Sequence, residues 1–377
     1  MQRAKRLCAV AAGLLAAGSM GQVAAEGRAQ QAGDRSYRVV TVAEGLEHPW
    51  GMAFLPGGDV LVTERPGRLR VVRGGVLAPE PIAGVPQVRA REQGGLMDVA
   101  LHPDFARNRL VYLSYSKPGP RGATTAVARG RLEGNRLTGV QEILEAKAWS
   151  TGGDHFGSRL VFDGRGHLFV SVGERGRMRN AQDLGTHAGK ILRLHDDGRV
   201  PADNPFVGCP GALPEIYAYG VRNPQGMALH PATGELWETE HGPRGGDELN
   251  RIRPGANYGW PLVTHGIDYS GRKVSERTEQ PGVAAPLHAW VPSIGTSGLA
   301  IYDGDRFPGW KGDFFVGGLA GRHLARVRLD GARVVEQEKL LGGRGHRIRD
   351  VRVGPDGFLY VLVDAAKAPV LRLEPVR

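Results

Sequence analysis

The hydrophobic positions of the chain recur in pairs of short apolar runs, each pair separated by a tight polar turn. In the last pair, Val351 and Val353 precede the turn and Leu359, Val361 and Val363 follow it, always at every second position. A period of two predicts β-strands, and the Pro, Gly and Asp residues between the runs predict a hairpin turn. Such a pair occurs six times, over residues 50–64, 95–116, 158–173, 226–240, 298–317 and 349–364.

The six pairs predict an all-β fold, namely a six-bladed β-propeller. One hairpin cannot bury both of its faces, so neighbouring units must stack against each other. A β-sandwich is the alternative architecture for the same strands. No segment after the first 25 residues has a long helical periodicity and no linker divides the chain, so we expect residues 37–377 to form one domain.

The N-terminal residues have the pattern of an export signal. Arg3, Lys5 and Arg6 precede the apolar run 7–17, and small residues at 23–25 suit a cleavage site. The run is too short to span a bilayer, so no stable membrane insertion is expected. We therefore expect residues 1–25 to be a signal peptide, residues 26–36 to be a flexible segment, and the mature protein to be periplasmic or secreted.

The composition narrows the function classes. The 57 Gly and 25 Pro residues suit a turn-rich β protein. The net charge of +10 falls to +7 without the signal, and the cations form no stripe with aromatic residues, so we expect no nucleic-acid partner. An anionic small molecule and an acidic protein fit this charge equally well. Cys8 leaves with the signal, and Cys209 alone cannot form a disulfide within one monomer.

Polar segments next to the predicted strands would meet at the mouth of the central channel. Asp154 beside His155 suits a general base, although a single loop histidine is also common at a surface. Arg222 offers a fork of donors to a carboxylate or a developing oxyanion. Arg347 and Arg349 fall on one side of a strand, which suits a polycarboxylate or simply a solvated strand face.

A further segment, 240–250, combines a Gly-Pro step with paired acids. Backbone carbonyls and carboxylates are the oxygen ligands that Ca²⁺ prefers, but the spacing is not that of an EF-hand. The chain contains no GxSxG, HExxH, P-loop or Rossmann motif, so the corresponding hydrolase and nucleotide-binding classes are not indicated.

Taken together, these segments resemble the soluble pyrroloquinoline quinone (PQQ)-dependent sugar dehydrogenases, and most closely the aldose sugar dehydrogenase branch, also called glucose/sorbosone dehydrogenases. The likeness runs from about residue 37 to about residue 375. The family is a periplasmic six-bladed propeller, which agrees with the repeats. The likeness is carried by RNPQG at 222–226, HGPRGGDELN at 241–250, NYGWP at 257–261, DHFGSRLVFDG at 154–164, AGKILRL at 188–194 and RIRDVRVGPDG at 347–357.

The resemblance implies a reaction and a set of site residues. His155 would be the general base that takes the proton from the C1 hydroxyl of an aldose, Asp154 would support it, and Arg222 would polarise the C5 oxygen of PQQ while the C1 hydride passes to PQQ and a lactone forms. The residues implied at the cofactor are Gln93, Asp154, Arg222, Asn223, Leu319, Ala320, Arg347 and Arg349. The residues implied at metal are the carbonyl groups of Gly242 and Pro243 for the Ca²⁺ that activates PQQ, and Glu248, Tyr258 and Asp247 for a second, structural Ca²⁺.

The sequence also departs from the family. Ala320 stands where many relatives carry a lysine beside PQQ, and Arg322 is the nearest cation that could replace it. Val221 stands in place of a family histidine, and the loop 293–297 lacks a proline that is usual there. The electrons would pass to an external acceptor such as a cytochrome or a quinone, and the protein would be a monomer or a homodimer.

Two other functions stay open at this point. A propeller without catalytic activity could bind a glycan or a protein through the same channel, which the missing lysine and the altered 293–297 loop favour. A Ca²⁺-dependent hydrolase of the lactonase type would turn over a lactone without any electron acceptor.

Overall fold

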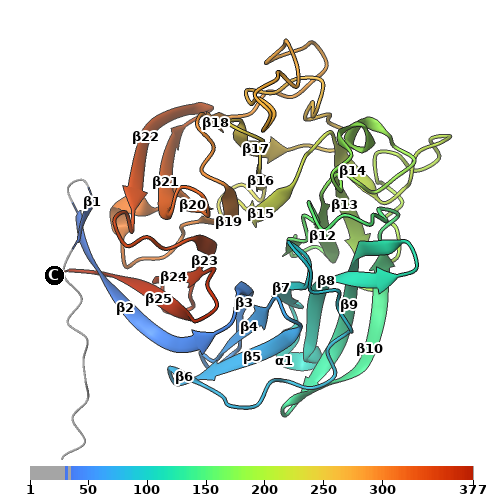
Figure 1. The fold of residues 1–377 in the computed structure, drawn as a ribbon. Helices are drawn as coiled ribbons and strands as arrows, with labels where there is room; N and C mark the ends of the chain where they lie inside the picture. Colours follow the sequence, from blue (N-terminus) through green and yellow to red (C-terminus); the bar gives the residue numbers. More distant parts are fainter. Residues whose placement is uncertain (1–29, 33–34, 377) are drawn as a thin grey trace, which may run out of the picture.

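The computed structural model describes residues 30–32 and 35–376. In these residues the strands form six antiparallel sheets, which are arranged in a ring around a central axis (Figure 1). The fold is therefore an all-β, six-bladed propeller, as the hydrophobic pattern predicts. The expected signal peptide, residues 1–25, lies outside the described residues.

Each sheet is one blade, and the strands within a blade follow one another in sequence except in the sixth. The blades, in order around the ring, are β3 (Pro49–Phe54), β4 (Val60–Glu64), β5 (Arg68–Arg73) and β6 (Val76–Leu77); β7 (Leu96–Leu101), β8 (Leu110–Gly119), β9 (Gly122–Glu133) and β10 (Arg136–Glu145); β11 (Leu160–Phe162), β12 (His167–Val172), β13 (Lys190–His195) and β14 (Ile216–Tyr219); β15 (Pro224–Leu229), β16 (Leu236–Glu240), β17 (Asp247–Ile252) and β18 (His288–Trp290); β19 (Thr296–Ile301), β20 (Phe314–Gly318), β21 (His323–Asp330) and β22 (Arg333–Leu340); and β23 (Ile348–Val353), β24 (Leu359–Val363), β25 (Ala368–Pro375), β2 (Arg35–Leu46) and β1 (Gln30–Ala32).

The six predicted hairpins are the first two strands of the six blades. In the sixth blade, for example, β23 and β24 pair antiparallel, with Val351 opposite Val361. Both faces of these inner strands are buried, since every residue of β4 and of β24 is buried between neighbouring blades. The described helices are the single turns α1 (Phe105–Asn108), η1 (Met178–Gln182) and η2 (Pro308–Trp310), and none has the length and hydrophobicity needed to cross a bilayer.

The sixth blade joins the two ends of the described chain. β2 pairs with β25 along most of its length, from Tyr37 opposite Pro375 to Leu46 opposite Ala368 (Figure 1). This pairing closes the ring, because it ties the first described residues to the last blade. β1 and the start of β2 fall within the segment 26–36, whose described part is therefore in strand.

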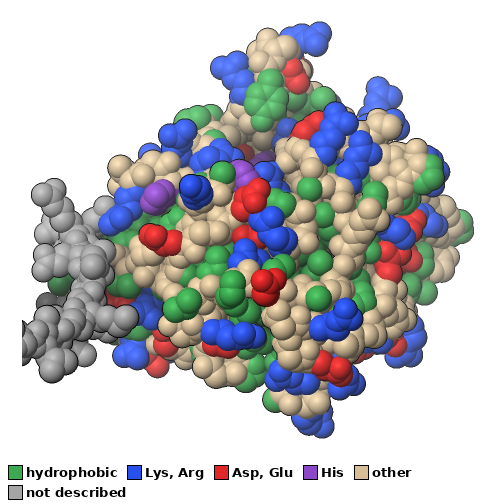
Figure 2. Space-filling model, turned by 60° about the horizontal axis from the view of Figure 1, so that its bottom comes forward, with side chains coloured by type: hydrophobic (Ala, Val, Ile, Leu, Met, Phe, Trp, Pro, Cys, Tyr) green, Lys and Arg blue, Asp and Glu red, His purple; other side chains and the backbone are tan. Residues whose placement is uncertain are grey.

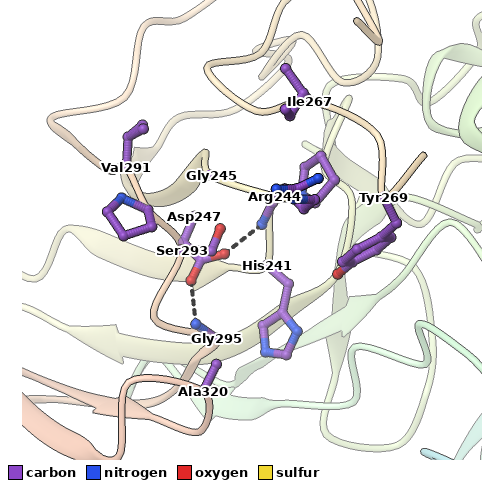
Figure 3. A pocket seen from close by; sticks show the side chains of 13 residues that line it. His241, Arg244, Gly245, Asp247, Ile267, Tyr269, Val291, Ser293, Gly295 and Ala320 are labelled. Carbon is purple, nitrogen blue, oxygen red and sulfur yellow. Dashed lines mark hydrogen bonds between the residues drawn. The ribbon is translucent and has the colours of Figure 1, made fainter. Parts of the chain in front are cut away.

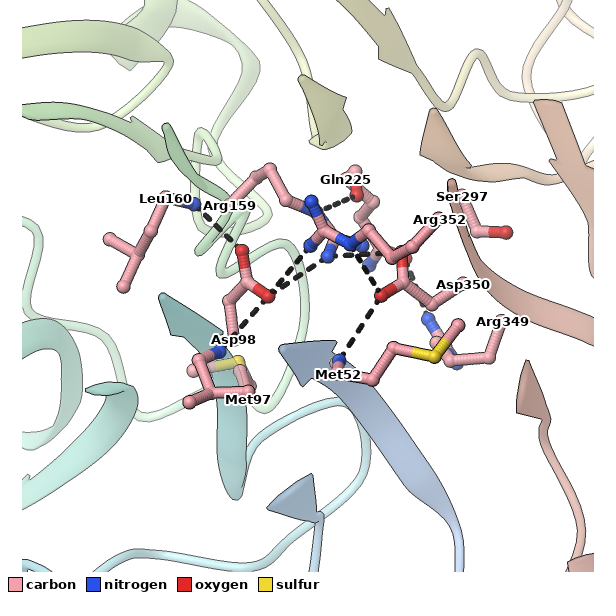
Figure 4. A network of polar contacts seen from close by, with 12 residues as sticks. Met52, Met97, Asp98, Arg159, Leu160, Gln225, Ser297, Arg349, Asp350 and Arg352 are labelled. Atoms are coloured by element: carbon pink, nitrogen blue, oxygen red, sulfur yellow. Dashed lines mark hydrogen bonds and ion pairs between the residues drawn. The ribbon is translucent and has the colours of Figure 1, made fainter. Parts of the chain in front are cut away.

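A buried network of charged side chains lies where the inner strands converge (Figure 4). Arg159 contacts Asp98 at 3.0 Å and Asp350 at 3.1 Å, and Arg352 contacts the same two carboxylates at 3.1 and 3.0 Å. These residues come from the second, third and sixth blades. Arg159 also donates to the carbonyl of Gln225 at 2.9 Å. The network thus joins four blades through one set of buried charges.

Candidate active site

Three of the predicted site residues meet although they lie before three different blades. The side-chain oxygen of Gln93 accepts hydrogen bonds from the backbone N–H of His155 at 3.1 Å and from the Asn223 amide at 3.5 Å. Asn223 in turn accepts from the N–H of Gly157 at 3.1 Å. The loops that precede the second, third and fourth blades are therefore held together at one end of the central channel.

His155 is held by a buried carboxylate. Its Nδ1 lies 2.7 Å from Oε1 of Glu174, whose side chain is only 2% exposed. A carboxylate accepts but does not donate when ionised, so Nδ1 carries the hydrogen and Nε2 keeps a lone pair. Asp154 makes no hydrogen bond to the imidazole among the described contacts; its carboxylate accepts from the Gln93 amide at 3.2 Å, and Gln93 in turn accepts from the backbone N–H of His155. The imidazole–carboxylate pair is His155–Glu174.

Glu174 is a site residue that the sequence did not reveal. It follows the second strand of the third blade, at the same end of the channel as His155. The signal that could have found it is an acidic residue directly after an inner strand. Residues that are adjacent in sequence do not need to contact each other, and the imidazole of His155 contacts Glu174 although Asp154 is its neighbour in sequence.

The guanidinium group of Arg222 is held by hydrogen bonds at Nη1, while its Nε has no partner among the described residues. Its Nη1 donates to the carbonyl oxygens of His241 and Gly242, both at 2.9 Å, and its guanidinium lies 5.2 Å from the ring centre of Trp260. Its backbone N–H donates to Glu240. Nε is buried and has no hydrogen-bond partner among the described residues. An unpaired buried N–H favours an acceptor supplied by a ligand.

A cavity of about 520 Å³ lies next to this group (Figure 3). His241, Gly242 and Pro243 line it from the fourth blade, and Ala320 lines it from the loop after β20. The side-chain Nε2 of His241 is shielded from solvent and has no partner among the described residues. Burial lowers the pKa of His241 to about 3, and the nearby Arg222, Arg349 and His155 add to this effect, so the ring is neutral.

The lowered pKa of His241 also connects the predicted base with two predicted arginines. His155, Arg222 and Arg349 come from loops or strands of the third, fourth and sixth blades, and all three act electrostatically on His241. The sequence named the segment that contains His241 but did not single out this residue. No sequence pattern around the Gly-Pro step indicates that the side chain of His241 lines a cavity.

Arg347 directly precedes β23 and Arg349 lies in it, and the two side chains reach the same carboxylate. Their Nη2 atoms lie 3.4 and 3.1 Å from the same oxygen of Asp364. Arg349 also donates to Gln225 at 2.8 Å, and Arg347 donates to the carbonyl of Leu319 at 3.2 Å. Burial alone would raise the pKa of Asp364, but Arg349, His48 and the other cations around it outweigh burial and hold that pKa well below its usual range.

Asp247 has a structural role in this geometry. Its carboxylate accepts from the backbone N–H groups of Gly242 at 2.9 Å, Ile294 at 2.9 Å, Gly295 at 2.6 Å and Thr296 at 3.0 Å. These four hydrogen bonds make Asp247 a brace between two loops, and its role at a metal stays a prediction.

Glu248 and Tyr258 lie together at a small cavity. Its volume is about 10 Å³, and Glu240 also lines it. Burial raises the pKa of Glu248 to about 7 and that of Glu240 well above its usual value. The Tyr258 hydroxyl is occupied, since it donates to the Arg251 carbonyl at 2.7 Å. The described residues contain no cluster of three or more His, Cys, Asp or Glu side chains suited to a metal.

The face drawn in Figure 2 shows Lys and Arg side chains interspersed with Asp and Glu. No continuous cationic stripe crosses this face, which agrees with the expectation from the sequence.

Comparison with known proteins identifies the family. The family model described as Glucose / Sorbosone dehydrogenase matches residues 46–372. The chain belongs to the glucose/sorbosone dehydrogenase family. It is 46% identical to aldose sugar dehydrogenase YliI of Escherichia coli, over 89% of this chain and 92% of that protein.

Two solved structures of this family superpose on most of the chain. The crystal structure of the soluble aldose sugar dehydrogenase from Escherichia coli in its apo form has a TM-score of 0.88 and 45% identity, over 90% of this chain and all of that one. The PQQ-bound form of aldose sugar dehydrogenase from Streptomyces coelicolor has a TM-score of 0.74 and 30% identity, over 90% of this chain and 98% of that one. The resemblance found in the sequence is thereby confirmed.

Proposed function

We propose that the protein is a PQQ- and Ca²⁺-dependent oxidoreductase that oxidises the C1 hydroxyl of aldose sugars to the lactone. The observation that carries the proposal is the 2.7 Å contact between His155 and the buried Glu174 carboxylate. Arg222 supports it, because it donates to the carbonyls of His241 and Gly242, which line the large cavity. Membership of the glucose/sorbosone dehydrogenase family supports it.

His155 is the proposed general base. With its Nδ1 hydrogen donated to Glu174, its Nε2 lone pair can take the proton of the C1 hydroxyl. The imidazolium that results is stabilised by the buried Glu174 carboxylate at 2.7 Å. Gln93 fixes the backbone of His155 through the 3.1 Å hydrogen bond and thereby sets the position of the ring.

The cations at and near the large cavity suit a flat anionic quinone, because Arg244 lines the cavity and Arg222 donates to the carbonyls of His241 and Gly242 at its edge. Arg222 and Arg349 each keep a buried Nε without a partner, and Asp364 alone offsets the paired charges of Arg347 and Arg349. These groups would bind carboxylates and polarise a carbonyl oxygen. PQQ, when bound, supplies the hydride acceptor, and the chain supplies its position and the surrounding charge.

Ca²⁺ has two proposed positions. The carbonyls of Gly242 and Pro243 border the large cavity, where an ion could bind beside the cofactor; the second lone pair of the Gly242 oxygen stays available beside its bond to Arg222. The buried carboxylates Glu240 and Glu248 flank the small cavity, and a cation there would relieve the cost of burying two acids together.

The remaining steps involve partners outside the chain. An external acceptor, such as a cytochrome or a quinone, would take up the electrons, and the proposed location is the periplasm or the extracellular space. A propeller without catalysis and a lactonase-type hydrolase are the competing functions, and only the dehydrogenase requires an electron acceptor.

The test is a titration of the recombinant mature protein with PQQ in the presence of Ca²⁺, followed by a panel of aldoses with a redox dye. We expect a change in the PQQ absorption spectrum and dye reduction that depends on the sugar. His155→Ala should lower kcat by at least about 100-fold. His167→Ala is the matched control, because His167 makes an equivalent 2.7 Å contact with Asp163 on the same blade outside the site. Equal activity of the two variants, or lactone turnover without dye, would contradict the proposal.

A further inference from the structure

A second cavity of about 520 Å³ lies beside the first. The two share Pro292 and Ser293, but Ala320, Gly242 and Pro243 line only the first. The second cavity lies between the loop that ends at Ile294, the start of β21, and a glycine-rich loop before the sixth blade. It is lined by Pro292, Ser293, Ile294, Gly321, Arg322, His323, Lys339, Gly342, Gly343 and Gly345.

His323 lines this cavity and carries a buried acceptor without a partner among the described residues. The residue is only 4% exposed, and its Nδ1 lies 2.8 Å from the carbonyl oxygen of Gly321. A carbonyl only accepts, so Nδ1 carries the hydrogen and Nε2 of the neutral ring is an acceptor. Nε2 is buried and has no partner among the described residues. An acceptor left unpaired in the interior is costly, so it favours a ligand that brings an O–H donor.

The charge of the cavity is positive. Arg322 and Lys339 line it, both are exposed, and neither makes an ion pair within residues 30–32 and 35–376. No Asp or Glu is among the lining residues. Two unpaired cations at one hollow attract an anion, and Arg322 can bind a carboxylate or a phosphate with two parallel hydrogen bonds.

The glycine-rich loop leaves the cavity open. A Cβ added at Gly342, Gly343 or Gly345 would meet no atom within 4 Å, so the backbone of this loop is not covered by other parts of the chain. Arg322, which the sequence suggested as a replacement for the missing lysine at position 320, lines this second cavity and not the first. Its charge therefore serves a different ligand.

We propose that the second cavity binds a hydroxylated organic anion, that is, a sugar derivative bearing a carboxylate or a phosphate. The anionic group pairs with Arg322 and Lys339, and a hydroxyl group donates to Nε2 of His323. A sugar acid of this kind forms when a lactone takes up water and its ring C–O bond breaks, giving a carboxylate, a hydroxyl group and a proton. Only this source of the ligand rests on the proposed function; the binding chemistry does not.

The experiment measures binding to the mature protein without PQQ by isothermal titration calorimetry, with gluconate, glucose 6-phosphate, glucose and inorganic phosphate as separate probes. We expect gluconate or glucose 6-phosphate to bind at least tenfold more tightly than glucose and inorganic phosphate, and this binding to weaken as the salt concentration rises. A preference for gluconate over glucose 6-phosphate identifies a carboxylate ligand, and the reverse identifies a phosphate ligand.

The double variant Arg322→Gln/Lys339→Gln should weaken that binding at least tenfold, whereas Arg333→Gln, which removes an exposed charge from the same blade, should not. His323→Phe should weaken it as well, and the exposed double variant keeps the test valid if this buried substitution fails to fold. Glucose or inorganic phosphate binding as tightly as the sugar anions, or unchanged binding in the double variant, would overturn the proposal. The double variant should bind PQQ as the wild type does. Loss of PQQ binding in both proteins would therefore contradict the proposed dehydrogenase function and leave the sugar-anion proposal to be judged by its own titrations.

Discussion

The contact between Glu174 and His155 allows a direct test of how the base is supported. Glu174→Gln removes the negative charge but keeps an oxygen that can accept the Nδ1 hydrogen of His155. The imidazole is neutral before proton transfer and charged after it, so the lost charge matters mainly during the reaction. A hydrogen bond to a charged group contributes about 1.5–3 kcal/mol, and the 2.7 Å contact of a side chain that is 2% exposed places this pair in that range.

That energy corresponds to a fall in kcat of about 10- to 100-fold, with little change in KM. The assay is steady-state dye reduction by the protein loaded with PQQ and Ca²⁺, with an aldose as the substrate. Asp154→Asn is the informative comparison, because Asp154 contacts Gln93 and not the imidazole, and it should lose less than tenfold.

Glu174→Asp keeps the charge on a shorter side chain and should fall between the wild type and Glu174→Gln. Thermal unfolding of each variant checks that the buried substitution has not lowered the amount of folded protein. Full kcat in Glu174→Gln, or an equal loss in Asp154→Asn, would refute the view that Glu174 stabilises the charged imidazole.

Three further predictions follow from other contacts. Asp98→Asn leaves the buried guanidinium groups of the channel network with one carboxylate fewer, and it should lower the free energy of unfolding by about 3–5 kcal/mol in urea denaturation. Asp364→Asn should change stability in a pH-dependent way: the depressed pKa of Asp364 means that its stabilisation is present above its unfolded pKa of about 4 and is lost as the pH falls toward the folded value. The difference in unfolding free energy between the wild type and this variant should therefore shrink below about pH 4 and stay constant between about pH 5 and 8. Gly242→Ala would place a Cβ 2.2 Å from the carbonyl carbon of Gly246, so it should distort the loop and weaken Ca²⁺-dependent PQQ binding, whereas Gly342→Ala meets no atom within 4 Å and should leave PQQ binding unchanged.

The inner half of each blade could be predicted from the sequence, and the outer half could not. Inner strands such as β24 are buried throughout, so their apolar residues stand out. The outer strand β22 alternates exposed and half-buried residues over most of its length and is rich in charge, which resembles a polar loop. The closure by β2 and β25 joins residues more than 300 positions apart, and no local pattern carries that information.

The candidate site shows the same division between local and spatial information. Alternation suggested that Arg347 and Arg349 act together, and both contact Asp364, but Arg347 precedes β23 and the register shifts at Arg349, so the shared carboxylate connects them and a regular strand does not. The partner of His155 was not, because Glu174 reaches the imidazole from the end of another strand of the blade. Asp247 was expected at a metal from the family resemblance, and only the fold shows that its carboxylate also accepts four backbone N–H groups.

The two cavities are lined by different cations, Arg244 in the first and Arg322 and Lys339 in the second. Arg347 and Arg349 share Asp364 on the side of the predicted cofactor residues, whereas Arg322 and Lys339 line the second cavity without a carboxylate. Because Ala320 adds no charge to the first cavity, we expect the binding of an anionic cofactor there to depend on Arg244, which lines it, and on Arg222, whose partners His241 and Gly242 line it. A cation restored at position 320 would act on the first cavity alone, and the loss of Arg322 would act on the second. The affinities for the quinone and for the sugar anion are therefore expected to vary independently.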